Sequence, residues 1–78
     1  MTLAERITVD PAVMGGRPCV RGLRVSVGTI VGLVAAGRSN AAILSLYPQL
    51  EPNDIHAALE YAAWRVGELE HPFTTRTE

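Results

Sequence analysis

Two prolines close together in the middle of the chain set its architecture. Pro48 and Pro52 enclose the segment Gln49-Leu50-Glu51. Because proline fixes φ and has no amide hydrogen, a helix cannot continue through Pro48, whereas Pro52 suits the first turn of a new helix. The sequence therefore predicts helices over residues 39–47 and 52–66, joined by a tight turn.

A further helix is predicted before this pair, over residues 27–36. Ser26 is a good N-cap for it and Gly37 a good stop, while Ser39 caps the next helix. Apolar residues recur at the spacing of one buried helix face in all three ranges. The residues expected to face the core are Val27, Ile30, Val31 and Val34 in the first helix, Ile43, Leu46 and Tyr47 in the second, and Ile55, Ala58, Leu59, Ala62 and Val66 in the third.

The N-terminal part of the chain lacks helical periodicity, and we predict strands and turns over residues 7–26. Ile7-Thr8-Val9 alternates like a strand, and residues 18–20 and 23–25 flank Arg21-Gly22, where glycine suits the tight turn of a hairpin. The fold class is therefore mainly α, a three-helix helix-turn-helix domain with a short N-terminal β-hairpin extension. A lone hairpin is marginally stable in water. It must pack on the helices or pair with strands of a second subunit, and we favour the second, a homodimer.

A second apolar stripe lies on nearly the opposite side of the third helix from the core stripe. It consists of Ala57, Tyr61 and Trp64. The N-terminal hairpin folds over this stripe, or a protein partner covers it. We favour the partner, because tyrosine and tryptophan are common at interfaces.

The chain of 78 residues is expected to form one domain over residues 1–66, followed by a flexible tail over 67–78 that is polar and interrupted by Pro72. No apolar run is long enough to span a membrane, and the N-terminus lacks the pattern of a signal peptide. Cys19, the only cysteine, cannot form an internal disulfide. A cytoplasmic location is the default expectation.

Chemistry-bearing clusters are sparse. Cys19 is far in sequence from His56 and His71, so no nucleophile and base are paired, and His56 with Glu60 makes only a lone pair of possible metal ligands. The glycine pair at 15–16 lacks the lysine of a phosphate-binding loop. We therefore expect no enzyme activity, metal, cofactor or small-molecule substrate.

Positive charge is concentrated in the first half of the chain. All seven basic residues are arginine, and five of them precede residue 40, although the net charge is −1. Arginine suits bidentate contacts to phosphate, but the base composition of a genome produces the same bias. These two explanations remain open.

Three short motifs carry a resemblance to a known family. They are Gly15-Gly16-Arg17-Pro18, Arg21-Gly22-Leu23-Arg24 and Tyr47-Pro48-Gln49-Leu50. In this order and spacing, the chain resembles the family named domain of unknown function 433 over about residues 7 to 66, with Leu23 in place of the usual threonine. The resemblance implies a homeodomain-like helix-turn-helix and a VapB-like antitoxin. The implied partner is a PIN-like ribonuclease toxin.

We therefore expect the antitoxin of a type II toxin–antitoxin pair, which inhibits the ribonuclease and binds operator DNA. The third helix would enter the major groove by its N-terminal part, or the paired hairpins of two subunits would form a basic ribbon that enters it. Which of the two elements reads the sequence stays open. The candidate DNA contacts are Arg17, Arg21, Arg24 and Arg38 for the backbone, unless they are solvated or form internal salt bridges, and Asn53, His56 and Glu60 for the bases.

The candidate contacts to the ribonuclease are Tyr61, Trp64, Phe73 and Arg76. The last two belong to the tail, which cannot fold alone and is expected to order on the toxin. The alternative function is a protein-interaction adaptor of helix-turn-helix shape that never binds DNA. The near-neutral pI of about 6.1 favours this alternative.

Overall fold

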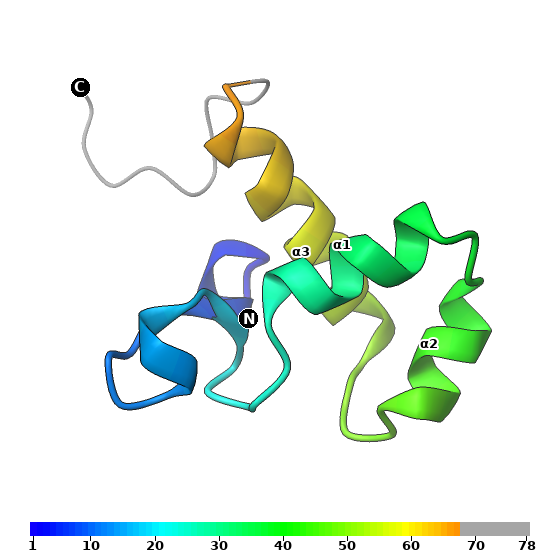
Figure 1. Ribbon diagram of the computed structural model, residues 1–78, viewed down its shortest axis with the longest axis horizontal. Helices are drawn as coiled ribbons and strands as arrows, with labels where there is room; N and C mark the ends of the chain where they lie inside the picture. The colour runs from blue at the N-terminus through cyan, green and yellow to red at the C-terminus, as the bar shows by residue number, and fades with distance from the viewer. Residues whose placement is uncertain (68–78) are drawn as a thin grey trace.

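The computed structural model describes residues 1–67, and its three helices form the body of the molecule (Figure 1). Helix α1 spans Val27–Ala35, α2 spans Asn40–Leu46 and α3 spans Pro52–Arg65. Each bound lies within one residue of the predicted range. The tail predicted over 67–78 lies outside the described residues except for Gly67. Helices α2 and α3 are joined at the proline-bounded turn, so the helix-turn-helix fold is confirmed.

Local capping explains where α1 and α2 begin and where α1 ends. The Oγ atoms of Ser26 and Ser39 accept hydrogen bonds from the amides of the third residue of each helix, Thr29 and Ala42, both at 3.1 Å. Gly37 has φ of 87°, and the amide of Arg38 donates to the Leu33 carbonyl at 3.0 Å. A left-handed glycine with this hydrogen bond terminates helices. The expected caps are therefore present.

The core lies between the three helices and the strands and turns of residues 7–26, called here the strand segment. Its buried members are Val20, Val25, Val27, Ile30, Ile43, Leu50, Ile55 and Ala58. Val31, Val34, Tyr47, Leu59 and Ala62 are partly buried and pack against them. Among the helices described, none is long and apolar enough to cross a membrane.

Two residues expected in the core are exposed. Leu46 is 56% exposed and Val66 is 73% exposed. At about 100° per residue, the inner face of α2 holds Ile43, Leu44 and Tyr47, and Leu46 falls outside it. Val66 is the C-cap residue, one position beyond the last helical residue. These two expectations were wrong because periodicity selects a stripe but not its edges or its end.

The strand segment is a small sheet built within one chain. Strand β1 (Ile7–Thr8) pairs antiparallel with β2 (Cys19–Val20), so that Ile7 faces Val20 and Thr8 faces Cys19. Two short 3-10 turns, η1 (Ala4–Arg6) and η2 (Met14–Gly16), precede the strands.

After β2 the chain reverses tightly, as the hairpin prediction required. Arg21 and Gly22 have φ of 45° and 73°, and the Val20 amide donates to the Val25 carbonyl at 3.0 Å. Val20 and Val25 are 0% and 2% exposed. The hairpin therefore packs on the helices of its own chain. This is the less favoured of the two expectations, and it means that burial of the hairpin needs no second subunit.

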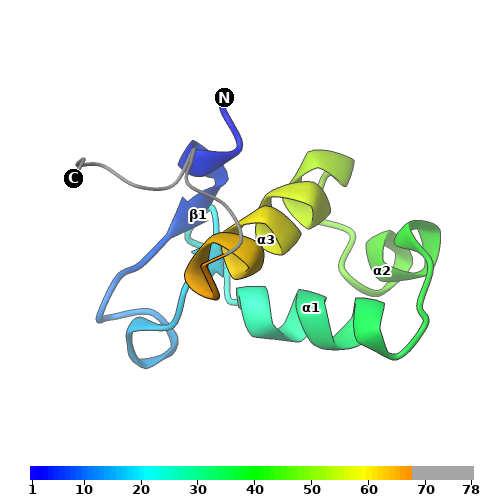
Figure 2. The same ribbon diagram turned by 90° about the horizontal axis from the view of Figure 1, so that it is seen from above.

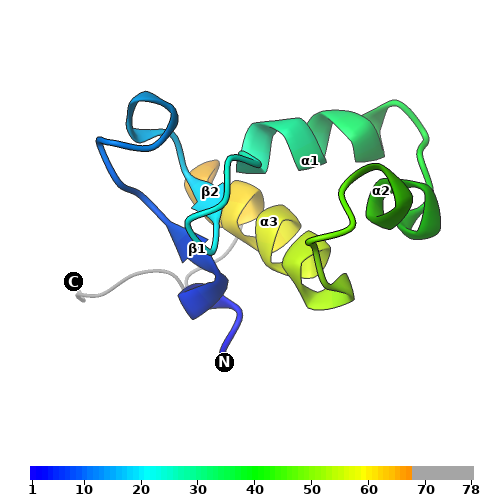
Figure 3. The same cartoon turned by 90° about the horizontal axis from the view of Figure 1, so that it is seen from below.

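The second apolar stripe of α3 is partly covered by the chain itself. Segments η1 and β1 contact α3, as Figure 3 shows for the start of the chain. Ala57 is fully buried, and Tyr61 and Trp64 are half-buried with ring centroids 5.6 Å apart. The favoured expectation, that a partner covers this stripe, is therefore not needed to explain the burial of Ala57.

Candidate functional site

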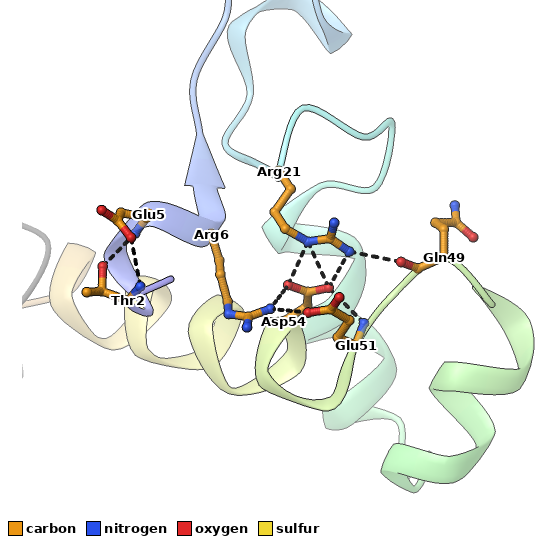
Figure 4. A network of polar contacts seen from close by, with 7 residues as sticks. All are labelled: Thr2, Glu5, Arg6, Arg21, Gln49, Glu51 and Asp54. Atoms are coloured by element: carbon orange, nitrogen blue, oxygen red, sulfur yellow. Dashed lines mark hydrogen bonds and ion pairs between the residues drawn. The ribbon is translucent and has the colours of Figure 1, made fainter.

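Two arginines from the N-terminal part of the chain meet one buried carboxylate at the start of α3 (Figure 4). Asp54 is 0% exposed. Its Oδ1 atom lies 2.9 Å from Nη1 of Arg6, and its Oδ2 atom lies 2.9 Å from Nη2 of Arg21. Nε of Arg21 also donates to the carboxylate at 3.1 Å. The pairing with Arg21 is thus bidentate, which is a strong and directional form of ion pair.

The same arginines also bind residues of the turn between α2 and α3. Arg6 donates to Oε1 of Glu51 at 2.7 Å, and Arg21 donates to the carbonyl of Gln49 at 2.9 Å. The amide of Glu51 in turn donates to Asp54 at 2.8 Å and completes the N-terminal cap of α3. These contacts fasten the strand segment to the turn between α2 and α3.

The electrostatics of this network favour the ionised forms. Burial alone would raise the pKa of Asp54, but hydrogen bonds from Arg21, from the Glu51 amide and from Arg6 outweigh it and hold that pKa below its ordinary value. Hydrogen bonds to Glu51 and Asp54 raise the pKa of Arg6, and the hydrogen bond to Asp54 raises that of Arg21. The two arginines and the two carboxylates have no net charge together, so the network is a neutral set of ion pairs with a structural role.

The arginines predicted to contact DNA are not brought together. Arg21 is bound to Asp54, whereas Arg17, Arg24 and Arg38 are exposed. Arg38 follows the C-terminal end of α1, while Arg17 lies by the N-terminal end of the same helix. The described residues therefore do not form a ribbon that presents all four, because one of them has an internal partner that sequence spacing did not reveal.

The predicted base readers do share one side of α3. Asn53 and His56 are exposed and Glu60 is partly exposed. Nε2 of His56 lies 3.1 Å from Oε2 of Glu60, one helical turn away. Within residues 1–67 no group of three possible metal ligands occurs, and Cys19 is buried with its thiol donating to the Arg17 carbonyl at 3.3 Å.

A groove of about 610 Å³ opens where the N-terminal end of α1 meets the C-terminal end of α3. Figure 2 shows these two helix ends side by side. The lining residues are Arg17, Pro18, Ser26, Val27, Gly28, Thr29, Tyr61, Ala62, Arg65 and Val66. The groove thus combines an apolar surface with two exposed arginines and has no acidic residue in its lining.

Of the residues predicted to contact a protein partner, Tyr61 lines this groove and Trp64 packs against Tyr61. Phe73 and Arg76 lie outside the described residues. Arg65 is the charged residue of the lining that sequence reasoning missed. Its position four residues after Tyr61 was the available signal, because residues four apart share a helix face.

Comparison with known proteins gives relatives without an assigned activity. Residues 7–62 match the family described as "Protein of unknown function (DUF433)". The uncharacterized protein y4eO of Sinorhizobium fredii is 41% identical over 58 residues, which are 74% of this chain and 26% of that protein. A DUF433 member from Anabaena variabilis, known from a crystal structure at 2.00 Å resolution, is 31% identical with a TM-score of 0.75. That match covers 80% of this chain and 61% of the other, so this chain spans only part of the length of both relatives.

Proposed function

This chain belongs to the DUF433 family, and we propose that it acts as the antitoxin of a type II toxin–antitoxin pair. In this proposal it carries out no chemistry of its own. It binds and inhibits a PIN-like ribonuclease in the cytoplasm, and two copies bind operator DNA to repress their own gene.

The observation that carries the proposal is the groove with Arg17 and Arg65. Both side chains are exposed, and neither makes an ion pair within the described part of the chain. Arginine beside an apolar surface is enriched at protein interfaces and among the residues that dominate their affinity. A protein partner would therefore find both an apolar surface and charge at this site.

The helix-turn-helix geometry supports the part of the proposal that concerns DNA binding. Asn53 and His56 are exposed on the first half of α3, the part that reads base edges when such a helix enters a major groove. The negative charge of Asp54, which would repel phosphates, is compensated by Arg6 and Arg21. Arg24 and Arg38 remain as the contacts to the phosphate backbone of DNA, and a homodimer has two copies of each.

A second candidate function is favoured by a specific observation. Because Arg6 and Arg21 are held by Asp54, two of the seven cations of a chain with net charge −1 are not available to phosphates. Binding to DNA depends strongly on such cations. The loss of these two cations favours a protein-interaction adaptor of helix-turn-helix shape that does not bind DNA.

Co-expression with the product of an adjacent ribonuclease gene tests both candidates. We expect the full chain to co-purify with the ribonuclease and to block its cleavage of RNA. A chain that leaves cleavage unchanged refutes the antitoxin proposal. Removal of residues 67–78 is expected to abolish inhibition, because this segment holds Phe73 and Arg76; retained inhibition would move the contact to Tyr61 and Trp64.

The purified complex is then titrated with a fragment of its own promoter, followed by fluorescence anisotropy at several salt concentrations. We expect Arg38→Ala to weaken binding and to reduce its salt dependence. Glu78→Ala, at the far C-terminus, serves as a control. An absence of promoter binding at every salt concentration would contradict the DNA-binding part of the proposal and favour the adaptor.

A further inference from the structure

We infer that the groove between α1 and α3 receives a short acidic segment of a partner protein. Its carboxylates pair with Arg17 and Arg65, and an apolar side chain between them packs on Val27, Tyr61 and Ala62. The inference rests on the proposed function, in that it names the chemistry of the partner at the same site.

Charge complementarity is the first step of the argument. The chain has eight acidic residues against seven arginines, yet the lining of the groove has two arginines and no acid. Within residues 1–67 neither Arg17 nor Arg65 has an ion-pair partner. A planar guanidinium selects carboxylates through two parallel hydrogen bonds. The groove is therefore a locally cationic surface on a chain whose net charge is −1.

The second step is the choice between a peptide and a nucleic acid. Neither of the other exposed arginines described, Arg24 and Arg38, is in the lining. A nucleic-acid strand needs cations repeated along its path, whereas most of the remaining lining is apolar and includes Val27, Tyr61 and Ala62. This mixture of apolar and cationic groups fits a segment in which acidic and apolar residues are neighbours.

The third step is size. A volume of about 610 Å³ lies within the usual range for binding clefts, roughly 300–1,000 Å³. The groove is bounded by helix ends on two sides. It therefore has room for a few side chains of an extended segment rather than for a whole domain.

Two glycines of α1 give a matched pair of variants. Gly28 lines the groove and Gly32, one turn later, does not. A Cβ at Gly28 would meet only Ser26 Oγ at 3.9 Å, and a Cβ at Gly32 would meet nothing within 4 Å. Gly28→Leu and Gly32→Leu should therefore both fold, and both should gain helix propensity. Only Gly28→Leu fills the groove.

The probe is a peptide selected from a random displayed library on the full-length chain, then synthesised with a fluorescent label. We expect the selected peptides to carry acidic residues beside phenylalanine or leucine. By fluorescence anisotropy, Gly28→Leu, Arg17→Glu and Arg65→Glu should each weaken binding by about tenfold or more. Gly32→Leu and Arg38→Glu should leave it unchanged, and thermal unfolding of each variant checks that it is folded.

Several results would overturn the inference. Peptides without acidic residues, or full affinity in Gly28→Leu, would show that the groove is not the site. A gain of about tenfold or more on deletion of residues 68–78 would make the chain's own C-terminal segment the occupant. Self-association lost only in Gly28→Leu would make it a second copy.

The experiments distinguish a failure of the groove proposal from a failure of the antitoxin proposal. Ribonuclease inhibition that survives Gly28→Leu and both charge reversals overturns the groove as the docking site of the toxin. Peptide binding with the expected variant pattern, in a chain that does not inhibit the ribonuclease, overturns the antitoxin function only.

Discussion

At the scale of single residues, Asp54 does most to join the two halves of the chain. Its carboxylate is fully buried and accepts hydrogen bonds from Arg6 and Arg21, whose side chains are 11% and 24% exposed. Removing one member of such a group leaves the opposite charges buried and unpaired, which costs more than the pair itself contributes. Arg21, which in sequence was a candidate for phosphate binding, is a structural residue for the same reason.

We expect Asp54→Ala to lower the free energy of unfolding by about 3–5 kcal/mol, because it removes the carboxylate that pairs with both Arg6 and Arg21. The measurement is urea unfolding followed by circular dichroism. Glu60→Ala, whose partner His56 lies on the surface of α3, is the matched control and should change little. Equal effects of the two variants would contradict a structural role for Asp54.

The pKa of Asp54 gives a pH dependence with a definite sign. Its pKa in the folded chain lies below the ordinary value of 3.8, so near that value the unfolded chain binds a proton more readily than the folded chain. The stabilisation is therefore present above about pH 4 and is lost as the pH falls through the folded pKa. Unfolding at a series of pH values should show this loss in the natural chain and a smaller one in Asp54→Asn, which keeps the shape but not the charge.

At the scale of elements, a glycine inside α1 and a glycine just after its C-terminal end have opposite roles. Gly32 has helical backbone angles and open space around it, whereas Gly37 has φ of 87° and ends the helix. A glycine inside a helix costs stability relative to alanine, but a left-handed position penalises any residue with a Cβ.

Gly32→Ala should therefore raise the free energy of unfolding by about 1 kcal/mol. Gly37→Ala should lower it by about 1–2 kcal/mol, since alanine is strained in the left-handed region. Denaturant midpoints of the two variants, measured beside the unaltered chain, check the prediction. Changes of the same sign would mean that the end of α1 does not have the hydrogen-bonded form described above.

At the scale of the whole molecule, the strand segment is a part of the folded core and not an arm. Val20 and Val25 belong to the same buried cluster as residues of all three helices, and η1 and β1 contact α3. Folding of one copy is therefore complete without strands from another. The homodimer of the proposed DNA-binding function would add contacts to a fold that one copy already has.

We accordingly expect the midpoint of thermal unfolding to be independent of protein concentration over a wide range. A chain whose fold required a second copy would become more stable as concentration rises, by mass action. Differential scanning calorimetry at several dilutions is the measurement. A rising midpoint would show that contacts between copies contribute to the fold.

Much of this fold was determined by the sequence alone, because the signals involved are local. Pro48 and Pro52 fix the corner, Ser26 and Ser39 begin their helices, and Arg21-Gly22 makes the hairpin turn. Each of these follows from backbone angles or hydrogen bonds within four residues along the chain. Helix bounds and most of the core could be predicted for the same reason.

Only the tertiary structure decided which residues form the sites. Arg21 meets Asp54 across 33 positions, and the groove brings together Arg17 and Arg65, which are 48 positions apart. Periodicity shows which residues share a face but not which other face lies against them. The partner of a charged side chain is set by how the helices and strands pack in space. The same arginine pattern in the sequence was therefore compatible with a contact to phosphate, a buried ion pair or a groove for a partner.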